Sequence, residues 1–115
     1  MRLPNAEYAT IMALKFTGYL LSVAHPRGCG KALFFSRFGF RVDAPQVLEQ
    51  ALLRHALDNE VVRTIDAPHG TKYEIEGRLQ APDGRAPMVK SVWIIDNGAV
   101  TPRFVTALPG LRPLT

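Results

Sequence analysis

The fold is decided by the stretch PMVKSVWIIDNGAVTPRFVTAL, residues 87–108. Its first part, Pro87 to Asp96, is apolar on both faces of an extended chain, which is typical of a strand in the middle of a sheet. Asn97-Gly98 follows and favours a hairpin turn, because Asn and Gly accept positive φ. The residues from Thr101 to Leu108 then form the last expected strand. The stretch predicts two antiparallel strands joined by a tight hairpin.

Two more strands are expected before this pair. Residues 61–67 predict a first strand, which Pro68-His69-Gly70 closes. Residues 71–80 alternate between apolar and charged side chains, as in a strand with one buried face. Pro82-Asp83-Gly84 predicts a turn, since Pro and Asp favour the bend and Gly accepts positive φ. Because parallel strands would need long crossovers, these short turns predict an antiparallel meander.

The chain before the strands has a helical period. Asn5 is a candidate cap for a segment from Tyr8 to Val23, which Gly18 weakens in the middle, so that one helix or two short ones are expected. Pro26 disfavours the helical conformation in the residue before it and ends this segment.

Two further helices are expected. One runs from about Gly30 to Phe38 and stops at Gly39, which suits a left-handed cap. The other begins at Asp43 as N-cap, with Gln46 completing a capping box, and ends near Asn59. Its apolar stripe includes His55, predicted to border the core.

Together these elements predict a single α+β domain over residues 1–115. Two or three N-terminal helices, in a helical half at 1–59, pack on one face of a four-stranded antiparallel meander sheet at 60–108. A proline-rich tail at 109–115 is expected to be frayed.

Composition narrows the class of protein. Hydrophobic residues make up 47% of the 115 residues, and the formal charge of +4 is consistent with a phosphate-bearing or acidic partner. One cysteine cannot form an internal disulfide, no apolar run approaches the roughly 20 residues of a membrane span, and no secretion signal is visible. We therefore expect a cytoplasmic, soluble protein without a membrane partner.

The segment His25-Pro26-Arg27-Gly28-Cys29-Gly30-Lys31 concentrates ionisable side chains on a flexible backbone. His25, Arg27 and Lys31 at the start of a helix favour an anion site. A plain helix–helix connection is the competing interpretation. Cys29 is a weaker candidate nucleophile, because no third residue that would orient it is visible.

The last two strands supply the other polar candidates, which are Tyr73, Lys90, Ser91, Arg103 and Thr106. Around an Asn97-Gly98 hairpin, Lys90 or Ser91 lies close to Arg103 or Thr106. Strict alternation nevertheless puts Arg103 and Thr106 on opposite faces unless a bulge intervenes. An ordinary solvent-facing sheet surface is the competing interpretation.

A metal site is not expected. The histidines and the cysteine are scattered over His25, Cys29, His55 and His69 without paired-cysteine or HExxH spacing. His69, in a Pro-His-Gly turn, is expected to be solvated. Phosphate-binding and dinucleotide glycine loops are also absent, so no metal and no small-molecule cofactor are predicted.

Several motifs are similar to those of a bacterial domain family of unassigned function. They are LPNA at the N-terminus, HPRG at 25–28, KA at 31–32 leading to FGF at 38–40, SVWII at 91–95 and PRFVT at 102–106. Members of that family include small stand-alone proteins and terminal domains of toxin- or phage-associated proteins. The resemblance implies a role in toxin–antitoxin systems or interbacterial conflict.

The order of helices followed by a four-stranded antiparallel sheet also resembles ribonucleases of the barnase–EndoU–colicin–RelE type. That resemblance implies metal-independent cleavage of RNA with the 2′-hydroxyl as nucleophile. It assigns His25 as general base or acid, Arg103 and Lys90 to stabilising the phosphorane, and Thr106 and Tyr73 to positioning the phosphate. Arg27, Lys31, Tyr73 and Ser91 are the expected RNA-binding residues.

Two alternatives stay open. In the first, the chain is a non-enzymatic module that binds a protein or a nucleic acid, with a cognate antitoxin or immunity protein as partner. In the second, it is a transferase or hydrolase that uses Cys29.

Overall fold

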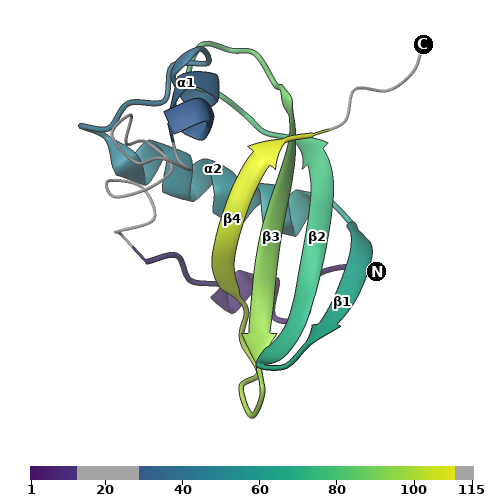
Figure 1. Ribbon diagram of the computed structural model, residues 1–115. Coiled ribbons are helices and arrows are strands. Elements are labelled where there is room, and N and C mark those ends of the chain that lie inside the picture. Colours follow the sequence, from purple (N-terminus) through teal and green to yellow (C-terminus); the bar gives the residue numbers. More distant parts are fainter. Residues whose placement is uncertain (13–28, 111–115) are drawn as a thin grey trace.

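A computed structural model describes residues 1–12 and 29–110 of the chain. Its sheet has four strands, β1 (Val61–Ala67), β2 (Gly70–Arg78), β3 (Met88–Asp96) and β4 (Arg103–Pro109). Each strand pairs antiparallel with the next in chain order, so the sheet is the predicted meander (Figure 1). β3 lies between β2 and β4, as its apolar character on both faces predicts.

The described helices all lie on one side of the sheet. They are the short 3-10 helix η1 (Ala6–Tyr8), α1 (Cys29–Ser36) and α2 (Pro45–Asp58), and α2 crosses behind the strands in Figure 1. Leu48 and Leu52 of α2 and Phe35 of α1 are fully buried, as are Trp93 of β3 and Ile75 of β2. The α+β class is confirmed, with two α-helices in the described part of the chain.

The beginning of the chain differs from the predicted first helix. Asn5 precedes η1 in a left-handed conformation, with φ 54°, and its side-chain amide donates to the carbonyl of Val100 at 2.6 Å instead of forming a capping hydrogen bond. Ala9 is extended, and Thr10 forms a parallel bridge with Arg103. Within residues 1–12, only the 3-10 helix Ala6–Tyr8 follows Asn5, and the predicted helix is wrong for residues 9–12, because pairing with β4 competes with the helical period. Residues 13–28 of that prediction lie outside the described residues.

The same N-terminal segment contacts both edges of the sheet. The amide of Val61, at the start of β1, donates to the carbonyl of Met1 at 2.7 Å. At the other edge, the amide of Phe104 donates to the carbonyl of Thr10 at 2.9 Å. Leu3, between these contacts, is buried in the core. This segment therefore supplies hydrogen-bond partners to two edges that would otherwise expose backbone groups.

Of the predicted helix caps, the one after α1 is present in the structure and the one before α2 is not. Gly39 follows α1 with φ +95°, the left-handed conformation that the sequence predicts. The predicted capping box of Asp43 and Gln46 is wrong, because Ala44 is the N-cap and no side chain bonds there. Asp43 instead accepts two hydrogen bonds from Arg41, at 2.9 and 2.8 Å. Pro45 begins α2 with its fixed φ and no amide hydrogen to satisfy.

The connection from β3 to β4 is longer than predicted, because the last strand is expected from Thr101 and begins two residues later. β3 ends at Asp96 and β4 begins at Arg103. Gly98 accepts φ +83° in the turn, and the amide group of Asn97 donates to the carbonyl of Pro68 at 2.9 Å. Asn97 thus joins the two turns at this end of the sheet.

The other end of β4 extends further than predicted. Pro109, which the sequence places in the frayed tail, pairs with Val89, and the amide of Gly110 donates to Met88 at 2.8 Å.

A buried histidine joins α2 to the sheet. His55 Nε2 lies 3.1 Å from the carbonyl of Gly77 and 3.0 Å from that of Val89, while Nδ1 lies 2.9 Å from Ser91 Oγ. Since carbonyls only accept, Nε2 carries the proton and Nδ1 accepts from the Ser91 hydroxyl, which itself accepts from Trp93 Nε1 at 2.9 Å. Burial lowers the pKa of His55, so the ring is held neutral.

We predict that Ser91→Ala destabilises the fold markedly. The substitution removes the hydrogen-bond partner of two buried groups, His55 Nδ1 and Trp93 Nε1, and an unsatisfied buried group costs about 1–3 kcal/mol. Urea denaturation measures the loss in the free energy of unfolding. The matched control is Ser36→Ala, whose exposed hydroxyl bonds only the carbonyl of Leu33 and for which about 0.5 kcal/mol or less is expected. Equal losses in the two variants would contradict the role of Ser91.

Candidate functional site

The side of the sheet opposite the described helices carries a cluster of charged side chains. Odd-numbered residues of β3, such as Ser91 and Trp93, face the helices, so Lys90, Val92 and Ile94 face the other way. Cross-strand register adds neighbours from β2 and β4 to this side (Figure 1). We call this side of the sheet the open face; its residues are Lys72, Glu74, Glu76, Lys90, Val92, Ile94, Arg103 and Thr106, of which Val92 and Ile94 are buried among their neighbours.

A β-bulge decides which residues of β4 reach the open face. Arg103 pairs with Ile94, and Thr106 pairs with Val92, although three positions separate the two residues of β4. Val105 is the extra residue, and the register shifts there. Strict alternation would have put Arg103 and Thr106 on opposite faces. The bulge places both on the open face with Lys90.

Two of the three cations of the open face, Lys90 and Arg103, are paired with carboxylates. Lys90 Nζ lies 3.5 Å from Glu74 Oε1, and both side chains are largely buried, with exposures of 24% and 15%. Arg103 makes a two-point contact with Asp96, at 2.7 and 2.9 Å. Its hydrogen bonds lower the pKa of Asp96 and raise that of Arg103. The pairs hold both cations in defined positions, and they also offset their charge.

The structure divides the predicted site residues into groups. Lys90, Arg103 and Thr106 share the open face. Tyr73 pairs with Trp93 and packs against the core on the helix side, and Ser91 is fully buried there. The sequence predicts that Tyr73 and Ser91 lie beside Lys90, Arg103 and Thr106. In the structure they lie on the opposite side of the sheet.

The residues of the first predicted loop are only partly described. Lys31 lies on α1 and is partly exposed. His25 and Arg27 lie outside the described residues. His69 is exposed in the turn between β1 and β2, as predicted.

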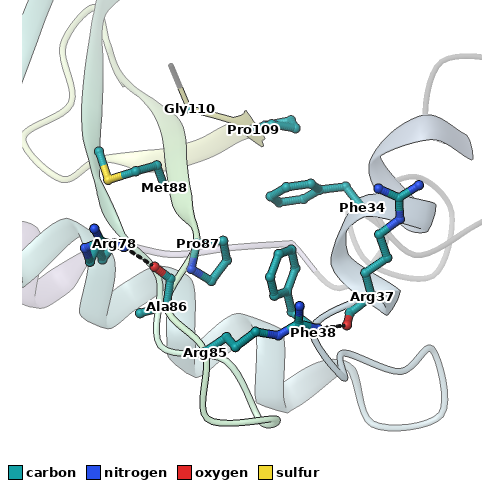
Figure 2. A pocket seen from close by; sticks show the side chains of 10 residues that line it. All are labelled: Phe34, Arg37, Phe38, Arg78, Arg85, Ala86, Pro87, Met88, Pro109 and Gly110. Atoms are coloured by element: carbon teal, nitrogen blue, oxygen red, sulfur yellow. Dashed lines mark hydrogen bonds between the residues drawn. The ribbon is translucent and has the colours of Figure 1, made fainter. Parts of the chain in front are cut away.

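Sequence reasoning missed the two carboxylates and a second surface. The alternation of residues 71–80 predicts only a charged face for Glu74, and Asp96 is predicted only as the end of a strand, although each pairs with a cation of a neighbouring strand. A groove of about 720 Å³ also lies between α1 and one end of the sheet (Figure 2). Its arginines, Arg37, Arg78 and Arg85, come from separate parts of the chain. A local sequence pattern does not reveal such a cluster.

The described residues offer no other obvious chemical centre. Among residues 1–12 and 29–110, no group of three His, Cys, Asp or Glu side chains could hold a metal ion. Within the same ranges, none of the helices has the length and apolar character required to cross a membrane.

Comparison with known proteins adds a family and a fold. A family model described as a domain of unknown function (DUF6883) matches residues 2–111. Among curated proteins, none matches the chain. A similar solved structure is a chain of a contact-dependent growth inhibition toxin–immunity protein complex from Klebsiella pneumoniae 342. It superposes with a TM-score of 0.67 at 21% identity, over 87% of this chain and 98% of that chain, which shows a shared fold.

The ion pair of Arg103 with Asp96 predicts a shift in the pKa of Asp96 when Arg103 is replaced. In Arg103→Gln, Asp96 loses the hydrogen bonds that lower its pKa, so its pKa is expected to rise toward the ordinary value of 3.8. A carboxyl with a lowered folded pKa stabilises the fold above its unfolded pKa, and this contribution is lost as the pH falls. NMR titration of side-chain carboxyl carbons measures the shift. Asp43, whose pKa Arg41 lowers in the same way, is the internal control and stays unchanged. An unmoved Asp96 titration would show that the pair does not exist in solution.

Proposed function

This chain belongs to a family of domains of unknown function, DUF6883. Because the family does not define an activity, we propose an activity from the residues of the open face. The protein is a toxin-type endoribonuclease that cleaves RNA without a metal ion. The observation that carries the proposal is the bulge at Val105, which gathers Lys90, Arg103 and Thr106 on a surface that no described helix covers. The shared fold with a chain from a toxin–immunity complex supports a toxin-related role.

The proposed reaction needs few protein groups. The 2′-hydroxyl of one nucleotide attacks the adjacent phosphorus, its proton passes to a general base, and the bond from phosphorus to the 5′ oxygen breaks. A general acid protonates that oxygen, which leaves a 2′,3′-cyclic phosphate and a 5′-hydroxyl end. Negative charge on the phosphorane is greatest in between, so positioned cations lower the barrier.

The open face offers those cations. Arg103 presents a planar fork that fits two phosphate oxygens, and Lys90 supplies a point charge. Thr106 carries a hydroxyl suited to positioning the phosphate. Glu74 and Asp96 hold Lys90 and Arg103 before RNA arrives, which is preorganisation of the kind that catalysis uses. His25 is proposed as the general base or acid.

A second candidate function has its own support. Lys90 and Arg103 already have carboxylate partners in Glu74 and Asp96, and a surface of nearly balanced charge suits recognition of a protein as well as of a phosphate. The similar solved structure, moreover, comes from a complex of a toxin with an immunity protein. A binding module that holds such a partner, or a nucleic acid, without cleaving anything is the alternative.

We predict that the purified protein cleaves RNA in the presence of EDTA and leaves 2′,3′-cyclic phosphate ends. Arg103→Gln and Lys90→Gln are expected to lower the cleavage rate about 10²–10³-fold each, the usual cost of removing a group that stabilises developing charge. His25→Ala is expected to be similarly impaired. Gel analysis of bulk tRNA and of an unstructured RNA measures the rates, and thermal unfolding confirms that each variant is folded.

The matched control is Arg54→Gln. Arg54 forms an exposed pair with Asp58 on α2, so its loss removes the same charge without changing the open face. Folded wild-type protein that cleaves no RNA would overturn the proposal. If expression of the protein then protects cells from a toxin instead of arresting growth, the binding-module alternative is correct. Activity that depends on Cys29 alone, and is lost in Cys29→Ser, would assign the reaction to the cysteine.

A further inference from the structure

The groove beside α1 has a basic rim. Its described lining residues include three arginines, Arg37, Arg78 and Arg85, and no aspartate or glutamate. The rings of Phe34 and Phe38 project from the α1 side toward the strands (Figure 2). A groove of about 720 Å³ with an apolar floor and a cationic rim has the size and chemistry of a ligand site.

The arginines of the groove are less neutralised than the cations of the open face. Arg78 donates one hydrogen bond to the carbonyl of Ala86, at 2.9 Å, and forms no ion pair within the described ranges. Arg37 is exposed and its side chain forms no hydrogen bond or ion pair there either. Only Arg85 has a carboxylate partner, Asp83 at 2.7 Å. The rim thus retains positive charge available to an anion.

The floor provides a stacking surface. The guanidinium of Arg85 lies 4.5 Å from the centre of the Phe38 ring, and Phe34 and Phe38 have ring centres 5.2 Å apart. Arg85 also donates to the carbonyl of Arg37 at 2.6 Å, which fixes its position. Aromatic rings and guanidinium planes are the groups on which unpaired RNA bases stack.

The groove continues the line of the open face. Arg78 pairs with Met88, two residues along the strands from the pair of Glu76 with Lys90, so all four residues lie on the same side of the sheet. Two residues of a strand span about 7 Å, so Arg78 lies within a short step of Lys90 along the same face. Arg78 is therefore the next cation along this face, beyond Glu76.

From this arrangement we propose that the groove binds the single-stranded RNA segment adjacent to the scissile phosphodiester. Arg78 and Arg37 contact its phosphates, and a base stacks over Phe34 or the Arg85–Phe38 pair. This proposal rests on the function proposed for the open face and adds a separate binding site to it. Continuity with the open face and the stacking floor favour RNA over an acidic protein segment as occupant.

The test uses the double variant Arg37→Gln/Arg78→Gln. Fluorescence anisotropy measures binding of a 2′-O-methyl oligouridylate, which cannot be cleaved, at several salt concentrations. We expect at least tenfold weaker binding, and a slope of log affinity against log salt shallower by about 1.4, because each single-strand phosphate contact contributes about 0.7. Cleavage of the dinucleotide UpU, which has no phosphate besides the scissile one and so none for Arg37 or Arg78 to contact, is expected to be unchanged.

The matched control is Arg2→Gln/Arg54→Gln, which removes the same charge elsewhere. The exposed Arg2 side chain contacts the carbonyl of Leu57, and the exposed Arg54 side chain pairs with Asp58. Unchanged affinity and salt slope in the groove variant, with RNA cleavage intact, would overturn the groove proposal and leave the proposed function standing. Tighter groove-dependent binding of polyglutamate than of the oligouridylate would also overturn it, in favour of an acidic protein partner. Wild-type protein that binds the oligouridylate through the groove but cleaves neither RNA nor UpU would overturn the proposed activity instead.

Discussion

The buried imidazole of His55 fixes how the central strand meets the helices. Its ring bonds the backbone of β2 and β3 with one nitrogen and the Ser91 hydroxyl with the other. Because side chains alternate along a strand, holding Ser91 inward turns Lys90 and Val92 outward. A slip of one residue would put Lys90 into the core. The candidate site on the open face therefore depends on a polar contact made on the opposite face.

The second determinant of that site is the bulge in β4. Val105 adds one residue to the strand, and the two polar side chains on either side of it then lie on the same face. Bulges re-aim side chains in this way at many functional surfaces. The pairs of Lys90 with Glu74 and Arg103 with Asp96 show that the two cations are held in place before any ligand binds. Cleavage of a bound RNA is what separates an enzyme from a binding module on this face.

The sheet was predictable because its signals are local. Alternation and turn residues predict residues 61–67 as a strand, and the structure has β1 at those bounds. The N-terminal helix was mispredicted at its start because Thr10 pairs with β4, a contact about ninety positions away. Asp43 satisfies Arg41 instead of capping α2, and nothing near Val105 marks the bulge. The residue types of the candidate site can therefore be chosen from the sequence, whereas which of them share a face depends on non-local pairing.

The most direct measurement is a backbone amide NMR titration of the protein with a non-cleavable 2′-O-methyl RNA. If the open face is the RNA-binding surface, the amides of Lys90, Arg103 and Thr106 shift in proportion to RNA bound, while those around Arg54 on α2 stay in place. Saturable binding that shifts the amides on α2 and leaves Lys90, Arg103 and Thr106 unmoved would contradict the assignment of the open face.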